Sequence, residues 1–165
     1  MDVDLLAVAA ADKPVIANLL QLYLHDSSEF EPSELSAHGT FDYAWLDSYF
    51  TEPTREAFLI TAAGRPAGFA LARCDVAGDA GPWNVGEFFV VRGHRGYGVA
   101  GQAARLLFRR HPGPWTLSYL PANPPAARFW PKLVGSVAAG PVSRHEFQPT
   151  GGAAAKVRLR FQIEP

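Results

Sequence analysis

The stretch RGHRGYGVAG at residues 92–101 constrains the fold of this chain more than any other part of its sequence. It follows the apolar run VGEFFVV and precedes AARLLFRRH, whose apolar residues recur at helical spacing. A strand that stops at a glycine-rich turn and opens into a helix exposes the first N–H groups of that helix, which have no intrahelical partner. The helix dipole adds partial positive charge there, and glycine lets an anion approach the backbone closely. The stretch therefore indicates either a phosphate-binding helix start or a tight turn with solvated arginines.

Two familiar phosphate loops do not fit this stretch. A Walker A loop needs Gly-Lys followed by Ser or Thr, and the chain has no such run. Residues 96–101 do spell G-x-G-x-x-G. A dinucleotide loop of that pattern, however, belongs to a parallel βαβ unit with an acidic residue about 20 positions further on. Here the preceding segments alternate like an antiparallel meander, and residues 116–121 read TLSYLP. A nicotinamide cofactor is therefore disfavoured.

Hydrophobic periodicity predicts the other elements. A helix at 13–26 is followed by a polar loop at 27–39 and a short aromatic helix that ends before Pro53. A further helix begins after its N-cap Asn123 and should be cut short by Pro131. Strands are expected at 4–10, 57–63, 66–76, 83–91, 115–120, 136–147 and 155–163, with a helix at 98–110 and a turn at 78–82.

Composition sets the class of protein. The chain has 165 residues, 48% of them hydrophobic, so a single domain over residues 1–165 can bury a substantial core. A net charge of −1 offers no basic stripe to a nucleic acid. Cys74 is the sole cysteine, which excludes an intrachain disulfide and favours a buried thiol. No spacing of His, Asp or Glu indicates a metal site, and no apolar run approaches the ~20 residues of a membrane span. We expect a cytoplasmic protein that binds neither nucleic acid, membrane nor metal.

A third phosphate-loop pattern does fit. Residues 95–100 read RGYGVA, which matches Q/R-x-x-G-x-G/A, the acetyl-CoA pyrophosphate loop of the GNAT (N-acetyltransferase) superfamily. The run EFFVV resembles the fourth strand of that family, and WTLSYL resembles its fifth. NPPAARFW is similar to its N-x-x-A-x-x-F-Y/W segment. The combination of EFFV, RGYGVA and NPPAARFW resembles a bacterial subgroup of predicted acetyltransferases within the superfamily.

The resemblance implies a mixed α/β (α+β) fold. Its central, mostly antiparallel sheet has about six or seven strands, is flanked by about four helices, and is splayed between strands four and five. The resemblance also implies acetyl-CoA as co-substrate, without a metal ion, with the diphosphate on the glycine-rich loop and the pantetheine arm along the fourth strand. The implied cofactor-binding residues are Phe88, Phe89, Val90, Arg95, Gly96, Tyr97, Gly98, Val99, Ala100, Gly101, Asn123 and Trp130.

Glu87 is the candidate catalytic residue. Transfer of an acetyl group to an amine requires the amine to lose a proton, which a carboxylate can accept, usually through water. Glu87 lies beside the expected thioester in an otherwise apolar run, where an acid is costly to bury without a purpose. The resemblance makes it the general base of a direct transfer to a primary amine. The alternatives for this residue are an outward-facing strand position and an ion pair with an arginine.

The general acid is left open by the sequence. The tyrosine that often protonates the departing thiolate in this family is replaced by Trp130, which has no acidic hydroxyl. Solvent, Tyr119 or an unassisted departure of the thiolate are the alternatives. The missing tyrosine also motivates a second hypothesis for the whole chain, an acyl-CoA-binding regulatory module with weak or no catalysis.

The acceptor is expected to be a small-molecule or peptide amine. The first two helices and their loop should roof its site, and this region is both acidic and aromatic. That combination suits a cationic amine with an apolar body; the alternative is a set of surface acids and core aromatics. A homodimer through the last strands is one expected assembly. The residues concerned are Asp26, Glu29, Glu31 and Glu34, with Phe41, Tyr43, Trp45, Tyr49 and Phe50.

Overall fold

The computed structural model describes residues 1–75 and 81–165, and the turn expected at 78–82 lies mostly outside them. The helices are α1 (Lys13–Ser27), α2 (Ser48–Thr51), α3 (Val99–Arg110) and α4 (Pro124–Val137). The strands are β1 (Val3–Ala7), β2 (Arg55–Ala62), β3 (Arg65–Cys74), β4 (Trp83–Val90), β5 (Gly113–Tyr119), β6 (Ser143–Phe147) and β7 (Lys156–Ile163).

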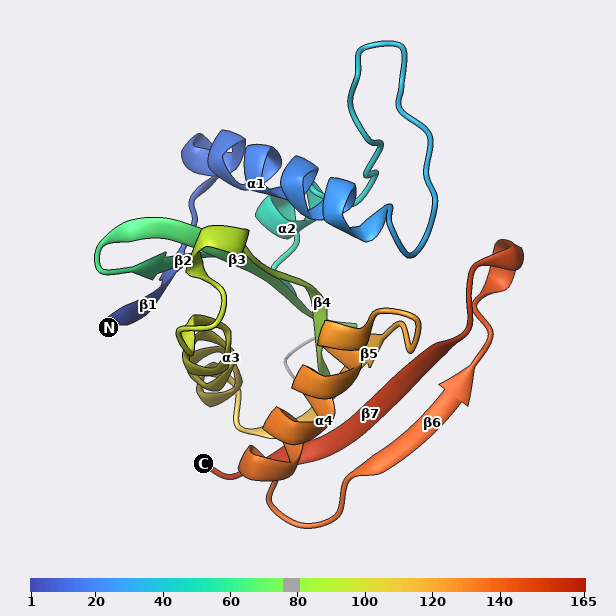
Figure 1. The fold of residues 1–165 in the computed structure, drawn as a ribbon. Helices are drawn as coiled ribbons and strands as arrows, with labels where there is room; N and C mark the ends of the chain where they lie inside the picture. The colour runs from blue at the N-terminus through green and yellow to red at the C-terminus, as the bar shows by residue number, and fades with distance from the viewer. Residues whose placement is uncertain (76–80) are drawn as a thin grey trace.

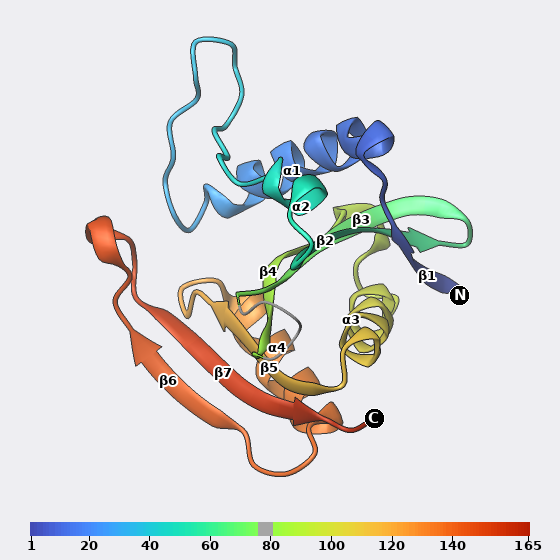
Figure 2. The same ribbon diagram turned by 180° about the vertical axis from the view of Figure 1, so that it is seen from behind.

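The strands form one seven-stranded sheet in the order β1-β2-β3-β4-β5-β7-β6. All neighbours are antiparallel except β4 and β5, which run parallel. Helices α1 and α2 lie on one side of the sheet, and α3 and α4 lie on the other (Figure 1). The same layers are seen from behind in Figure 2. The mixed α/β fold with a mostly antiparallel sheet is therefore confirmed.

The parallel pair is short, and the two strands then separate. Only three positions of β4 pair with β5, and the last of them joins Val85 to Leu117. Beyond this point β5 continues to pair with β7 as far as Tyr119, while β4 continues to pair with β3 as far as Val90. The edge of β4 that faces β5 thus carries main-chain groups without a strand partner. The expected splay between the fourth and fifth strands is confirmed.

A β-bulge at Gly86 determines the direction in which Glu87 points. Leu71 of β3 pairs with Glu87, but the next residue of β3 pairs with Val85, so Gly86 is the extra residue in β4. Side chains alternate between the faces of a strand, and one inserted residue reverses the alternation. Glu87 therefore shares the face of Leu71, beneath α1, whereas Val85 points to the side of α3 and α4.

Large apolar side chains fill both sides of the sheet. Phe108 of α3 and Trp115 of β5 are 1% exposed on one side, and Ile16 of α1 and Phe69 of β3 are fully buried on the other. Cys74 is buried, as expected. Among the described residues, no helix combines the length and apolar character that crossing a membrane requires.

The aromatic helix expected before Pro53 is mostly absent, because only Ser48–Thr51 are helical. The side chain of Gln21, in α1, forms hydrogen bonds with the backbone at the start of that segment. Gln21 donates from Nε2 to the carbonyl oxygen of Phe41 and accepts from its N–H at Oε1, both at 2.9 Å. With both of its main-chain groups bonded in this way, Phe41 cannot join a helical ladder.

The helix after Asn123 is longer than expected. Pro131 lies inside α4, which continues to Val137, so residues 136 and 137 are helical and β6 begins only at Ser143. A proline inside a helix costs about 3 kcal/mol. Burying a Leu or Val side chain returns about 1.5–3 kcal/mol, and both Leu133 and Val134 are buried beyond the proline. Core packing therefore outweighs the lost hydrogen bond, and Pro131 itself is exposed.

Gly68 is a site where the sheet tolerates no side chain. A Cβ on this residue would lie 1.9 Å from the carbonyl oxygen of Phe89 on the neighbouring strand. We predict that Gly68→Ala destabilises the fold by about 3 kcal/mol or more, a fall in Tm of about 10 °C. The matched control is Gly135→Ala in α4, where an added Cβ meets no atom within 4 Å. This control should gain up to about 1 kcal/mol from helix propensity. Equal Tm values for the two variants in thermal denaturation would contradict the close strand contact.

Candidate functional site

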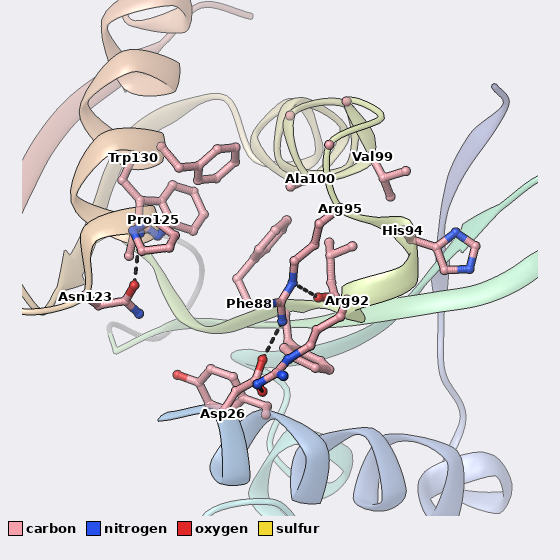
Figure 3. Close-up of a pocket in the computed structure, with 18 of the residues that line it drawn as sticks. Asp26, Phe88, Arg92, His94, Arg95, Val99, Ala100, Asn123, Pro125 and Trp130 are labelled. Atoms are coloured by element: carbon pink, nitrogen blue, oxygen red, sulfur yellow. Dashed lines mark hydrogen bonds and ion pairs between the residues drawn. The ribbon is translucent and has the colours of Figure 1, made fainter. Parts of the chain in front are cut away.

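A cavity of about 650 Å³ lies at the start of α3. Gly98 is the N-cap of this helix with φ at 78°, and Gly96 has φ at 83°, conformations that favour glycine. No side chain of the described residues caps the helix. Its first N–H groups, on Val99, Ala100 and Gly101, have no intrahelical acceptor. Figure 3 shows Val99 and Ala100 at this helix start beside the cavity. The site is thus an open, partly positive helix end.

All but one of the sequence-predicted cofactor residues line this cavity. The exception is Tyr97, whose side chain is 66% exposed and does not line it. The unpaired part of β4 forms one wall, and α4 forms another. The cavity brings together Phe88, Phe89, Val90, Arg95, Gly96, Gly98, Val99, Ala100, Gly101, Asn123 and Trp130.

The two arginines of the glycine-rich stretch are held by an acid of α1. Asp26 accepts hydrogen bonds from Arg92 at 2.7 Å and from Arg95 at 2.5 Å. Arg95 also donates from Nε to the carbonyl oxygen of Val90, at 2.8 Å (Figure 3). Burial raises the pKa of Asp26, but the hydrogen bonds from the arginines outweigh this effect and leave it below its usual value. Sequence reasoning missed this contact because Asp26 and Arg95 are 69 positions apart.

Asn123 and Trp130 hold the wall made by α4. Asn123 accepts a hydrogen bond from the N–H of Ala126 at Oδ1, 3.2 Å away, so its predicted capping is confirmed. Trp130 is 8% exposed and packs edge-to-face on Phe88, with 5.2 Å between the ring centroids. The indole acts here as a rigid apolar side of the cavity.

A second cavity, of about 560 Å³, meets the first at the splay between β4 and β5. The two share lining residues, among them Tyr23, Phe88, Asn123 and Trp130. Glu87 lines only the second cavity. A group bound in the first cavity along β4 would therefore adjoin a group bound in the second beside Glu87.

Two tyrosines surround the Glu87 carboxylate. Tyr43 donates its hydroxyl to Oε1 of Glu87 at 3.3 Å, and the hydroxyl of Tyr23 bonds to the same carboxylate. Burial raises the pKa of Glu87, and these hydrogen bonds only partly oppose the rise. Burial also raises the pKa of both tyrosines, so they remain protonated donors. Tyr23 reads in the sequence as one more apolar residue of a helix, which is why its contact with Glu87 was missed.

The alternatives raised for Glu87 do not match its surroundings. The carboxylate is directed to the face covered by α1, and within residues 1–75 and 81–165 it forms no ion pair. The positive charges of Lys156 and Arg73 lower its pKa from a greater distance, by less than burial raises it. Glu87 is thus an acid that retains its proton to a higher pH than an exposed glutamate.

The four acids expected at the acceptor site do not gather in one cavity. Asp26 is paired with two arginines, Glu29 lines only the first cavity, and the exposed Glu34 lines neither. Of the four acids, only Glu31 lines the second cavity. The turn after α1 separates these four side chains, and their spacing in the sequence does not indicate this separation. Three of the five expected aromatics, Tyr43, Trp45 and Tyr49, do line the second cavity.

In residues 1–75 and 81–165, no three His, Cys, Asp or Glu side chains gather as metal ligands would. Tyr119, an alternative general acid, lines the second cavity but not the first. Its hydroxyl forms a hydrogen bond with Arg144.

Comparisons with known proteins agree on the fold. No family model matches the chain, and no curated protein sequence matches it either. Solved structures, by contrast, do match this chain. An acetyltransferase from Thermus thermophilus is 17% identical, with a TM-score of 0.61 over 99% of this chain and 98% of that one. An acetyltransferase of the GNAT family from Streptococcus pneumoniae is 10% identical, with a TM-score of 0.60 over 98% and 100%.

A third similar structure contains ligands. The spermidine N-acetyltransferase from Vibrio cholerae, in complex with CoA and spermine, is 16% identical, with a TM-score of 0.66 over 98% of this chain and 95% of that one. Each match spans nearly the full length of both chains. The chain has the fold of the GNAT acetyltransferases.

The environment of Glu87 predicts a pH-dependent effect on stability. Because the pKa of this carboxyl is raised in the folded protein, the folded chain binds more protons than the unfolded chain above the usual pKa of 4.5. The stability contributed by Glu87 therefore falls as the pH rises through that window. We predict that the Tm of Glu87→Gln minus that of the wild type becomes more positive from about pH 4 to about pH 7. The exposed Glu34→Gln controls for the loss of one negative charge. A difference that shrinks with rising pH in thermal denaturation would show that the carboxylate is stabilised instead.

Proposed function

We propose that this protein is an acetyl-CoA-dependent N-acetyltransferase that transfers the acetyl group directly to a primary amine. The observation that carries the proposal is the junction of the two cavities at the splay. On one side lies the open start of α3, and on the other lies Glu87. The proposal takes residues 1–165 as one cytoplasmic domain that needs no metal.

The first cavity suits the cofactor. The N–H groups of Val99, Ala100 and Gly101 can donate hydrogen bonds to a diphosphate, which a helix N-terminus stabilises through its dipole. The unpaired edge of β4 offers main-chain groups to the pantetheine amides, as an added strand would. Arg95, fixed by Asp26 and the Val90 carbonyl, contributes positive charge beside this path. The CoA complex of the Vibrio cholerae protein of the same fold supports this cofactor assignment.

The second cavity suits the acceptor and the proton transfer. An ammonium has no lone pair, so Glu87 accepts a proton, directly or through one water, before the amine nitrogen attacks the thioester carbon. The raised pKa of Glu87 makes it a stronger base than an exposed carboxylate. An N–H on the unpaired edge of β4 stabilises the oxyanion that forms. The nitrogen gives up its second proton to solvent, the carbon–sulfur bond breaks, and the neutral amide forms as CoA leaves as a thiolate.

The thiolate needs no tyrosine in this scheme. An ordinary thiol has a pKa of about 8.5, so its thiolate is a tolerable leaving group near neutral pH and can take a proton from solvent. Trp130 then serves as a wall beside the leaving sulfur. A binding module without catalysis would have no reason to keep a buried carboxylate without an ion pair among the described residues at the junction, which favours the enzyme over this second hypothesis.

The start of α3 gives the first test. An acid in the first turn of a helix stabilises that helix, but Ala100→Glu would place the charge against a bound diphosphate. At a concentration of acetyl-CoA about 100-fold above Kd, the wild type should gain about 2.7 kcal/mol, a rise in Tm of about 5–10 °C. We predict that Ala100→Glu keeps the Tm of the free protein and loses this rise. Gln102→Glu, exposed and outside the cavity, adds the same charge and should keep the rise. Equal stabilisation of both variants by acetyl-CoA would place the diphosphate elsewhere.

Glu87 and Tyr43 give the second test, read as amine-dependent CoA release over a range of pH. Glu87→Gln should lower kcat by about 10²–10⁴ while acetyl-CoA still binds. Tyr43→Phe removes a hydrogen bond to the carboxylate, which raises the pKa of Glu87 further. The acidic limb of the kcat/KM profile should therefore move to higher pH. Tyr43 lines only the second cavity, so binding of acetyl-CoA should be unchanged. A Glu87→Gln variant with wild-type turnover would remove Glu87 as the base.

A further inference from the structure

The charged side chains around the second cavity are more often positive than negative. Arg73 of β3 and Lys156 and Arg158 of β7 line it, against two carboxylates, Glu31 and Glu87. These five are its charged residues in the part of the chain that the structure describes. Because the whole chain carries a net charge of −1, this excess is produced by the fold and not by composition.

The two cations of β7 point to the same open face. Lys156 and Arg158 alternate with Val157 and Leu159, which are buried in the core cluster that includes residues of α4. The cations therefore lie on the opposite face of β7. Figure 2 shows β7 and β6 in front of α4, with no described helix over their near side. The second cavity thus extends from Glu87 beneath α1 to an uncovered, positively charged part of the sheet.

These cations have hydrogen-bonding capacity left for a ligand. Within residues 1–75 and 81–165, the Lys156 ammonium makes neither a hydrogen bond nor an ion pair, although it is half-buried. Arg73 Nε is buried without a hydrogen bond in the same residues. Its ion pair with the largely exposed Asp75 is long, 3.5 Å from Nε to Oδ1. Arg158 makes one long hydrogen bond, 3.4 Å from Nε to Ser118. A buried donor without a partner is costly, so a matching acceptor would bind strongly.

From this arrangement we infer that the acceptor amine carries an anionic group, a carboxylate or a phosphate, at its end away from the nitrogen. The inference rests on the proposed transferase function and specifies its substrate class. The amine lies beside Glu87, and the anionic group lies against Lys156 and Arg158, with Arg73 adding positive charge. Tyr43, Trp45 and Phe147 line the same cavity and suit an apolar body. The class is that of amines with a carboxylate or a phosphate at the far end of the molecule, such as ω-amino acids and aminoalkyl phosphates.

The same charges disfavour a polyamine. A molecule that is positive at both ends would meet like charges on β7, and like-charge contacts oppose binding. The likeness of fold to a spermidine N-acetyltransferase is therefore not carried over to a polyamine substrate for this chain.

The test uses amines in matched pairs that differ by the anionic group. Suitable pairs are 4-aminobutyrate with butylamine, 6-aminohexanoate with hexylamine, and phosphoethanolamine with ethanolamine, with spermidine as a separate cationic probe. CoA release is measured with acetyl-CoA at saturation, and binding of each amine to the CoA-saturated protein is measured by calorimetry. We expect the anionic member of at least one pair to be bound and turned over at least about tenfold better, as one charge-assisted hydrogen bond provides. The pair that responds distinguishes carboxylate from phosphate.

Variants locate the effect. Lys156→Gln should lower the ratio of kcat/KM for the anionic member to that for its neutral partner by about tenfold or more. Lys156→Glu should reverse the preference for the anionic member of a pair. Lys156→Arg keeps the positive charge and should retain that preference. The ratio is used because Lys156 also lowers the pKa of Glu87, an effect shared by both members of a pair. Lys132→Gln is the matched control, since Lys132 is exposed on α4 and lines neither cavity.

The outcomes separate this inference from the proposed function. If acetyl-CoA neither stabilises the protein nor supports turnover with any amine, the transferase proposal fails. If acetyl-CoA binds, the inference is overturned in three cases: no anionic amine binds, spermidine or the neutral members are preferred, or the preference survives unchanged in Lys156→Glu. Turnover of peptide N-termini without any dependence on Lys156 would also overturn it.

Discussion

The separation of β4 from β5 after three paired positions is the constraint on which the site depends. Phe88 lies at the separation and packs against Phe129 and Trp130 of α4, so aromatic side chains hold the gap open. The unpaired main-chain groups along β4 must then find water or a ligand, because each would cost about 1–3 kcal/mol if buried without a partner. A fold that leaves a central strand edge uncovered between two cavities offers that edge for binding.

The bulge at Gly86 couples this edge to the chemistry. Without the extra residue, Glu87 would share the face of Trp83 and Val85 in the core above α3 and α4. With the extra residue, the carboxylate faces α1, where the protonated hydroxyls of Tyr23 and Tyr43 donate hydrogen bonds to it. A Cβ on Gly86 would lie 2.4 Å from the hydroxyl of Tyr49, so a larger residue here would have to displace that side chain. One small residue thus determines on which side of the sheet the candidate base lies.

The sequence allowed prediction of those features that depend on neighbouring residues. The glycine-rich turn, the helix start at Gly98 and the Asn123 cap are local patterns, and the structure contains all three. The partners of Glu87 depend on sheet order and on the bulge, neither of which leaves a periodic signal. Tyr43 lies 44 positions from Glu87. Pro131 misled for a related reason, since the packing that keeps α4 intact beyond it is tertiary.

Two carboxylates at the junction show why position matters more than residue type. Asp26 has two arginines within hydrogen-bond distance, and its pKa is lowered despite partial burial. Glu87 has only the neutral hydroxyls of Tyr23 and Tyr43 within hydrogen-bond distance, and burial raises its pKa. The first is therefore held as an anion that orders the arginines of the phosphate loop, while the second keeps its proton to a higher pH than an exposed glutamate. A sequence with a net charge of −1 gives no hint of this division. It arises because Asp26, at the end of α1, meets the arginines of the loop before α3, whereas Glu87 is buried beneath the same helix, where the hydrogen bond from Tyr23 only partly opposes the effect of burial.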